Sequence, residues 1–312
     1  MCTAVKIDYD GGTVLGRTMD YEVHVDWNVL YLPRNYAFAT DLFGEPIRAR
    51  YEALGICFRN FNPLKDGVNE HGLMGVTNAF NGFNLYPNHT VPRKINLSSL
   101  DYLNYALTQY RTVDELVEDV PNIHFSTKDA RGEDAISPDF HHVFTDPGGR
   151  CVIVEPRDKE IHIVENPYGV MTNSPRFSSH TRRLHKLIDT ENPEAFNGSK
   201  GLPGGYDPVS RFIRAYYLRV MSPHPETGDL ALAQCHNILN AVSLPEGFIR
   251  NRQYDDTTFT RYLCAYEAER RCLTVKSDTS PAVFQIALSD IADKTERQTW
   301  YLPEGFTGIS LT

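Results

Sequence analysis

The pattern of apolar and polar positions in the first eighty residues is typical of strands. Short apolar stretches are separated by Gly, Pro and Asn, and Gly11-Gly12 falls between the first two stretches as a hairpin turn would. We expect these strands to pair in one antiparallel sheet. The predicted strands are residues 1–7, 13–20, 27–32, 53–58 and 72–77.

From Leu97 the apolar period changes from two to that of a helix. Leucines and tyrosines recur at helical spacing as far as Tyr110, with Ser98 or Ser99 available as an N-cap. A second helix is predicted to start at Thr112, because a Glu three residues later completes a capping box. The sequence therefore predicts a helical layer after the first sheet.

A second block of strands follows, and then further helices. Asp146-Pro147-Gly148-Gly149 is typical of a tight turn between two strands of a second meander. The predicted strands are 142–145, 151–155, 161–164 and 170–173; a basic helix covers 176–190, a Gly/Pro-rich stretch 197–207, and helices 209–220 and 229–242; strands return at 257–266, 270–276 and 283–288.

Two strand blocks, each followed by helices, favour an α+β architecture. Two packed sheets covered on both outer faces by helices would give a four-layer αββα sandwich. No stretch has the composition of an interdomain linker, and the chain shows no internal repeat. We therefore expect a single domain over residues 1–312.

Composition narrows the class of partner. With 41% hydrophobic residues, the 312-residue chain can bury a substantial core. A net charge of -9 without a basic cluster argues against nucleic acid and against an anionic membrane surface, so a small molecule is the expected partner. No apolar run is long enough to span a membrane and no signal peptide is visible, which favours the cytoplasm.

Motif searches exclude several chemistries. There is no GxGxxG after a strand, no Walker loop, no HExxH and no GxSxG, so no nucleotide is bound through a known motif. The six cysteines lack CxxC spacing and are interpreted as reduced thiols. His141-His142 and the pair His180 and His185 lack a carboxylate at ligand spacing, so no metal site is predicted.

The position of Cys2 is the first candidate for chemistry. If the initiator Met1 is removed, one residue carries a thiol and a free α-amine, a nucleophile and a base whose ordinary pKa is near ~8. Arg17 and Asp20 return beside it on the predicted partner strand, and we expect a bulge or strand end that lets both approach Cys2. The alternative is an inert cysteine in a buried strand.

Two later segments carry further candidates. Asn173 follows a strand and precedes Ser174-Pro175, so it is either a turn former or an amide donor to an oxyanion. Arg211 follows a Gly/Pro loop into the first turns of a helix, where a solvated arginine is the default expectation.

Taken together, six segments resemble the choloylglycine hydrolase family of N-terminal nucleophile hydrolases, which contains penicillin V acylases and conjugated bile salt hydrolases. The resemblance runs in the same order from residue 1 to about 290. RTMD, PRNY, GVNEHGLMG and GVMTNSP look closer to the penicillin V acylases. The six segments are MCTAV at the N-terminus, GRTMDY at 16–21, LPRNY at 32–36, DGVNEHGLMG at 66–75, GVMTNSP at 169–175 and LPGGYDPVSRFIRAYY at 202–217.

The resemblance implies the N-terminal nucleophile αββα fold, a homotetramer, no cofactor and a set of catalytic roles. Cys2 would attack a linear amide, its α-amine would shuttle the proton, and Arg17 and Asp20 would position and polarise both groups. Asn173 would donate to the oxyanion, and Arg211 would complete the charge network around the thiol.

A second oxyanion donor is implied in the loop after GLMG, where acylases tend to carry Tyr and bile salt hydrolases Asn. Alignment without gaps places Ala79 at this position. Ala79 still supplies a backbone N–H, but it lacks the larger side chain that Tyr or Asn would provide. Phe80, Phe83 and Tyr86 then predict an apolar wall for a hydrophobic acyl group.

The sequence favours a penicillin V acylase-like enzyme that cleaves linear N-acyl amides through a thioester. Two alternatives stay open. One is a conjugated bile salt hydrolase with the same chemistry and a different pocket. The other is a non-enzymatic or masked protein in which Met1 is retained and the α-amine is tied up in a peptide bond.

Overall fold

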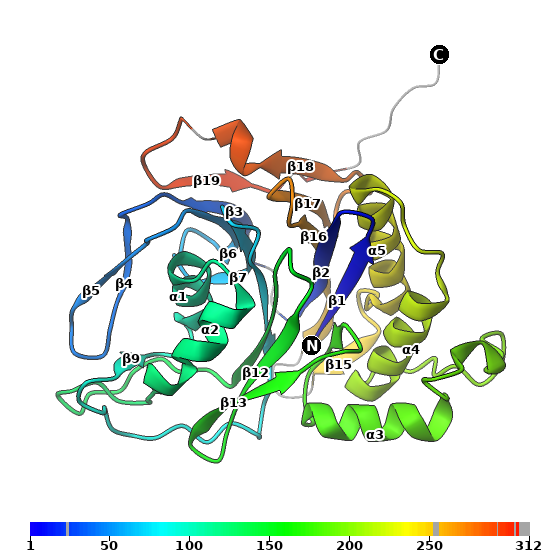
Figure 1. The fold of residues 1–312 in the computed structure, drawn as a ribbon, viewed down its shortest axis with the longest axis horizontal. Helices are drawn as coiled ribbons and strands as arrows, with labels where there is room; N and C mark the ends of the chain where they lie inside the picture. The colour runs from blue at the N-terminus through cyan, green and yellow to red at the C-terminus, as the bar shows by residue number, and fades with distance from the viewer. Residues whose placement is uncertain (23–24, 252–255, 292, 303, 306–312) are drawn as a thin grey trace.

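The structure is a computed structural model that describes residues 1–22, 25–251, 256–291, 293–302 and 304–305. Two large antiparallel sheets pack face to face. Helices cover both outer faces, with α1 and α2 on one side and α4 and α5 on the other (Figure 1). Among the described residues, no helix has the length and apolar character needed to cross a membrane.

The first sheet contains the N-terminal hairpin. The two strands of this hairpin are joined by a turn at Gly11, whose φ of +103° is a conformation that glycine adopts without strain. The strand order is β14 (Val170–Met171), β1 (Cys2–Tyr9), β2 (Gly12–Tyr21), β16 (Asp256–Glu267), β17 (Cys272–Ser277) and β18 (Phe284–Ala287), with β15 (Ile249–Asn251) paired to β16.

The second sheet takes most of the remaining strands, and two small sheets lie beside it. Its order is β13 (Glu160–Glu165), β12 (Cys151–Arg157), β11 (Phe140–Thr145), β8 (Met74–Ala79), β7 (Leu64–Asn69), β6 (Ala53–Phe58), β3 (Trp27–Leu32) and β19 (Gln298–Tyr301); the small sheets are β4 (Ala37–Thr40) with β5 (Pro46–Arg48), and β9 (Ile95–Leu97) with β10 (Ile123–Phe125).

The prediction that the first eighty residues form one sheet is wrong. β1 and β2 join the first sheet, whereas β3, β6, β7 and β8 join the second, and β14 leaves the second meander to pair with β1. The apolar pattern indicates which residues are buried but not which strand is the partner.

The second sheet is buried on both faces. On β3, Val29 and Tyr31 point into the cluster between the sheets, while Leu30 and Leu32 point into the cluster beneath α1. A strand in this position has apolar residues throughout, so no polar face marks its orientation.

The helices lie close to their predicted positions, except that the first helix begins later than predicted. Thr112 accepts a hydrogen bond from the Glu115 N–H, as the capping box predicted. The helix expected from Leu97 begins only at Tyr102, because residues 95–97 form β9 and pair with β10. The helices are α1 (Tyr102–Gln109), α2 (Val113–Asp119), α3 (Phe177–Leu187), α4 (Pro208–Met221) and α5 (Gly228–Val242), with 3-10 turns η1 (Val120–Asn122), η2 (Pro193–Ala195) and η3 (Leu288–Ile291).

Candidate active site

Cys2 is the first residue of β1 and is buried between the sheets, opposite Met19 of β2. Its Sγ accepts a hydrogen bond from Arg17 Nη2 at 2.7 Å. Its main-chain N–H donates to Asn173 Oδ1 at 2.6 Å, and the amine of the preceding Met1 donates to the Asp20 carbonyl at 3.0 Å. The start of the chain is thus fixed by polar contacts on both sides of the sulfur.

Arg17 is fully buried and bridges the two sheets. From β2 its Nη1 donates to the carbonyls of Lys65 and Thr77, both at 3.0 Å, and to Asp66 Oδ2 at 3.3 Å. Burial alone would lower the pKa of Arg17, but the neighbouring Cys2 and acidic groups outweigh it and the pKa is raised. The guanidinium is therefore a permanent positive charge against the Cys2 sulfur.

Asp66 is the buried counter-charge of Arg17. Its carboxylate also accepts hydrogen bonds from Tyr262, at 2.6 Å, and from Tyr266. Both phenols come from β16, four residues apart, and so point to the same face of that strand. Sequence reasoning missed this cluster; Asp66 in the DGVNEHGLMG segment was its only visible signal.

Asp20 lies on the other side of Cys2, at the point where the ladder shifts register. The predicted bulge is not found on β2, whose ladder with β1 runs without a shift from Gly12 to Met19 and ends one residue before Asp20. The register shift lies on β16 instead, where Thr260 pairs with Asp20 and Tyr262 with Met19. Thr260 donates to Asp20 Oδ1 at 2.6 Å. Asp20 Oδ2 is buried and has no hydrogen-bond partner among the described residues; Arg211 Nη1 lies 3.8 Å away.

Arg211 is fully buried, contrary to the default expectation of a solvated arginine. Asp207 caps α4 by accepting from the N–H groups of Val209 and Ser210, and this start directs Arg211 inward. Its Nη1 donates to the Cys2 carbonyl at 2.7 Å. Burial lowers the pKa of Arg211, although Asp20 and Cys2 act in the opposite direction.

Asn173 joins these groups to the second sheet. Its Oδ1 accepts from Cys2 N and from Arg211 Nη2, the latter at 2.9 Å, and its Nδ2 donates to the Ala79 carbonyl at 2.9 Å. An amide nitrogen has two hydrogens, so one remains available for a further acceptor. The side chain is committed to contacts with other parts of the chain, which a simple turn former would not need.

Ala79 presents its backbone toward this group. It pairs opposite Phe140, and the next residue, Phe80, donates its N–H to the Asp139 carbonyl at 2.8 Å. Because hydrogen-bonded and non-hydrogen-bonded pairs alternate in an antiparallel ladder, the N–H and C=O of Ala79 both face away from β11. The contact of its carbonyl with Asn173 is consistent with that direction.

Three buried side chains hold the segment that carries Asn173. His141 Nε2 lies 2.9 Å from the Thr172 carbonyl, His180 Nε2 lies 2.8 Å from the Asn173 carbonyl, and Asn78 donates to Thr172 at 2.9 Å. Burial lowers the pKa of His141 to about 3, so its ring is neutral at pH 7. The described residues contain no group of three potential metal ligands, and these histidines contact carbonyls instead.

The three aromatic residues of the predicted acyl wall lie in different surroundings. Phe80 is fully buried and stacks on His141, with ring centroids 4.5 Å apart. Phe83 is partly buried beside Phe80. Tyr86 belongs to the cluster beneath α1, where its hydroxyl donates to the Pro138 carbonyl at 3.0 Å.

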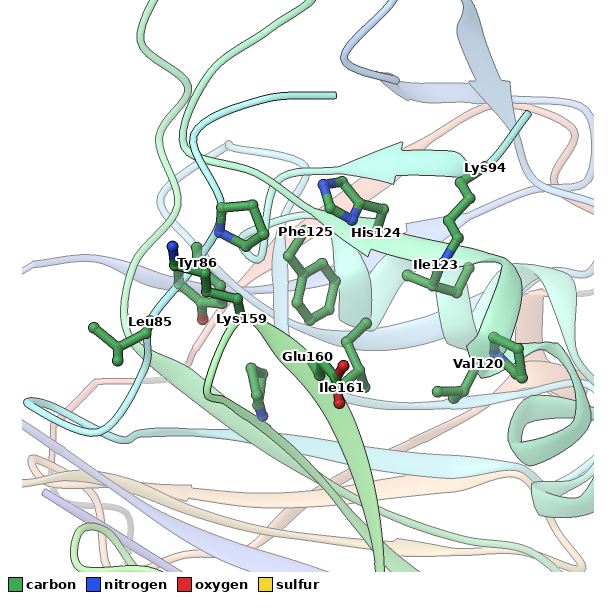
Figure 2. A pocket seen from close by; sticks show the side chains of 13 residues that line it. Leu85, Tyr86, Lys94, Val120, Ile123, His124, Phe125, Lys159, Glu160 and Ile161 are labelled. Atoms are coloured by element: carbon green, nitrogen blue, oxygen red, sulfur yellow. The ribbon is translucent and has the colours of Figure 1, made fainter. Parts of the chain in front are cut away.

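Tyr86 also lines a pocket of about 250 Å³ between β10 and β13, shown in Figure 2. Its neighbours there include Phe125, Ile161 and Lys159 (Figure 2). Neither Cys2 nor any residue gathered around it lines this pocket. Of the three aromatic residues, the structure therefore gives Phe80 and Tyr86 clear packing roles.

Comparison with known proteins identifies matches over nearly the whole chain. The model of the family described as linear amide C–N hydrolases, choloylglycine hydrolase family, matches residues 2–296. The bile salt hydrolase/transferase of Clostridium perfringens is 26% identical over 284 residues, 85% of this chain and 86% of that protein. The penicillin V acylase of Pectobacterium atrosepticum is 26% identical over 306 residues, 89% of this chain and 77% of that protein.

Two solved structures show the same fold. The conjugated bile acid hydrolase of Clostridium perfringens matches with a TM-score of 0.87 and 22% identity over all of both chains. The penicillin V acylase of Agrobacterium tumefaciens matches with a TM-score of 0.79 and 22% identity, over 96% of this chain and 90% of that one. With the two packed sheets and their outer helices, these matches confirm the predicted four-layer αββα sandwich.

Proposed function

The chain belongs to the choloylglycine hydrolase family of linear amide C–N hydrolases, and from this we propose that it cleaves N-acyl amides with Cys2 as nucleophile. That it is a hydrolase of linear amides follows from the family. The nucleophile, the thioester intermediate and the substrate are our proposal.

One observation carries the proposal: the Arg17 guanidinium contacts the Cys2 sulfur while Asn173 contacts both the Cys2 nitrogen and the strand of Ala79. A guanidinium against the sulfur is placed to stabilise the negative charge that the sulfur carries when it attacks a carbonyl. An inert core cysteine needs no such partner. Burying a guanidinium costs free energy, so this contact is not expected around a cysteine without a role.

In the acylation step, Cys2 Sγ attacks the amide carbonyl carbon and the carbonyl π electrons move onto oxygen. The free N–H of Asn173 and the backbone N–H of Ala79 stabilise this oxyanion. The α-amine takes the thiol proton and gives it to the departing nitrogen as the C–N bond breaks. The products of the step are an amine and a thioester on Cys2.

Hydrolysis of the thioester reverses these roles. The α-amine takes a proton from water, the hydroxide attacks the thioester carbonyl, and the same two donors stabilise the oxyanion. When the C–S bond breaks, the proton returns to sulfur and the carboxylic acid leaves. No oxidant or reductant is required.

This mechanism requires removal of Met1, because the α-amine of Cys2 is otherwise part of a peptide bond. Asp20 supports the proposal through its buried Oδ2, which has no hydrogen-bond partner among the described residues. A buried acceptor without a partner costs about 1–3 kcal/mol, and an α-ammonium group on Cys2 would supply the missing donor. Arg211 then holds the Cys2 carbonyl from the other side.

For the substrate we propose a penicillin V acylase-like preference for an apolar acyl group. Burial of a methylene group stabilises a complex by about ~0.8 kcal/mol, and the small Ala79 side chain leaves room beside the nucleophile. The competing candidate is a conjugated bile salt hydrolase, the activity named for several of the similar proteins. Comparing kcat/KM for penicillin V, a medium-chain N-acyl homoserine lactone and glycocholate decides between them.

The direct test of the nucleophile is Cys2→Ala. We expect complete loss of amide hydrolysis with an unchanged circular dichroism spectrum and Tm. Cys151→Ala is the matched control, since it removes another buried thiol that is remote from Arg17 in the second sheet. Measurable turnover by purified Cys2→Ala would overturn the proposal.

Four further properties stay predictions. The homotetramer is implied by the family resemblance, whereas the single domain over residues 1–312, the cytoplasmic location and the absence of nucleic-acid partners are predicted from the sequence pattern and composition. Light scattering coupled to gel filtration tests the tetramer.

A further inference from the structure

Lys65 carries a positive charge close to the candidate active site. It lies on β7, and its carbonyl accepts from the same Arg17 nitrogen that contacts Thr77. Its ammonium group lies 5.2 Å from the ring centroid of Phe140, in cation–π geometry. Phe140 is the residue that pairs directly opposite Ala79.

The ammonium has no hydrogen bond or ion pair within the described part of the chain. Asp101, at the start of α1, interacts electrostatically with Lys65, but no ion pair within 4 Å joins the two side chains. Burial and Arg17 lower the pKa of Lys65 to about 8, while Asp101 and Asp66 raise it. The side chain is therefore still largely protonated at pH 7.

The position of Lys65 relative to Cys2 indicates which part of a substrate it would meet. In the proposed mechanism the leaving nitrogen must approach the Cys2 nitrogen, which faces Asn173. Arg17 contacts the Cys2 sulfur and the main-chain carbonyl of Lys65, and Lys65, Ala79 and Phe140 lie at the same end of the second sheet. An acyl group that leaves the sulfur over this end of the sheet would pass Lys65.

The acyl group would pass a small side chain, Ala79, then the aromatic ring of Phe140, and then the cationic end of Lys65. Ala79 and Phe140 form a non-hydrogen-bonded pair, so their side chains lie close together on one face. All three residues, Lys65 included, are only partly buried. An acyl chain over Ala79 and the Phe140 ring would bring its far end to the ammonium group.

We propose that Lys65 is a specificity-determining residue that selects acyl groups ending in a carboxylate, so that half-amides of dicarboxylic acids are a preferred substrate class. This inference rests on the proposed cleavage of N-acyl amides by Cys2, and it changes the proposed acyl group to one that is apolar where it crosses Phe140 and carries a carboxylate at its far end. An acyl chain of this kind gains an ion pair with Lys65 and apolar contact with Phe140. A neutral acyl chain gains only the apolar contact.

The test uses the full-length enzyme and two pairs of probes. N-adipoyl and N-hexanoyl 4-nitroanilide differ only by a carboxylate at the acyl end. N-hexanoylglycine and N-hexanoylglycinamide differ only by a carboxylate on the leaving group. The variants are Lys65→Met, which removes the charge, Lys65→Arg, which keeps it, and Lys94→Met, an exposed control.

We expect the wild type to prefer N-adipoyl over N-hexanoyl nitroanilide in kcat/KM. Lys65→Met should reduce that preference by about tenfold or more, through a higher KM for the adipoyl probe. Lys65→Arg should retain the preference and Lys94→Met should leave it untouched.

Four outcomes would overturn the inference. They are a wild type that prefers the hexanoyl probe, an equal loss on both nitroanilides in Lys65→Met, loss of the preference in Lys65→Arg, and a change confined to the glycine and glycinamide pair. The first needs no variant, so the inference is testable even if Lys65→Met does not fold. If the wild type hydrolyses none of the four probes, the proposed function itself fails.

Discussion

Two replacements of Asn173 separate its proposed catalytic role from its structural role. Asn173→Ala removes the amide that we propose as an oxyanion donor, and it also removes the oxygen that accepts from Cys2 N and Arg211 Nη2. In Asn173→Asp the acceptor remains but both amide hydrogens are gone. The two variants therefore share the catalytic defect and differ in the structural one.

The magnitudes follow from these contacts. Losing one of two oxyanion donors should lower kcat by roughly 10²–10³ in both variants, with a smaller change in KM. Asn173→Ala also leaves a buried Arg211 N–H without its acceptor, which should lower the free energy of unfolding by about 1–3 kcal/mol. Asn173→Asp keeps an acceptor for Arg211 but puts a carboxylate oxygen in place of the donor to the Ala79 carbonyl, so its loss of stability reports that contact and not the Arg211 contact.

Steady-state kinetics on a chromogenic N-acyl amide and urea unfolding of the same preparations measure both effects. Thr127→Ala, which removes a hydroxyl contact on the opposite side of the second sheet, is a control for general damage. If Asn173→Asp kept kcat within tenfold of the wild type, Asn173 would not be an oxyanion donor. A rise in KM alone in Asn173→Ala would restore the turn-former interpretation.

Three further predictions concern the nucleophile, the buried carboxylate and the response to acid. Cys2→Ser should keep at most a trace of turnover, because a hydroxyl is deprotonated far less readily than a thiol; kcat above a few per cent of wild type would contradict this. Tyr266→Phe removes a donor to buried Asp66 and should lower the free energy of unfolding in urea by about 1–3 kcal/mol, whereas the exposed control Tyr301→Phe should stay within about 0.5 kcal/mol; equal effects would refute the role. Burial lowers the pKa of His236 to about 4. As the pH falls, the unfolded chain therefore protonates His236 before the folded protein does, and the free energy of unfolding decreases between about pH 6.5 and about pH 4. In urea unfolding at several pH values, His236→Gln should reduce this decrease, and the same dependence on pH in variant and wild type would contradict the prediction.

The pattern of the sequence was sufficient to predict most elements and the return of Arg17 and Asp20 beside Cys2, whereas Asn173 and Arg211 were placed there only by the family resemblance. Hydrophobic periodicity predicted the helices at 209–220 and 229–242 close to α4 and α5. The spacing of Arg17 and Asp20 predicted a bulge or strand end between them; β2 has no bulge there, and the register shift lies on its partner β16. These features depend on local pattern, which a single sequence contains.

Features that depend on partners distant in the sequence were not predictable. The sequence could not show that β14 pairs with β1, which is what brings Asn173 to Cys2. From the residues alone Arg211 was expected in solvent, because nothing near it in the sequence shows what α4 packs against, and only the family resemblance placed it near the thiol. Lys65 and Asp66 drew no attention as site residues, since their neighbours come from β8, β11 and β16.

The account depends most on a covalent acyl group at an N-terminal Cys2, and one mass-spectrometric measurement tests it. The enzyme is quenched in acid during turnover of an N-acyl amide, and both the intact protein and its N-terminal peptide are weighed. We predict a protein lighter by one methionine residue than the full sequence, with a fraction of the N-terminal peptide heavier by the acyl group and released by hydroxylamine. An active preparation that retains Met1, or an acyl group found on any peptide other than the one carrying Cys2, would contradict the account.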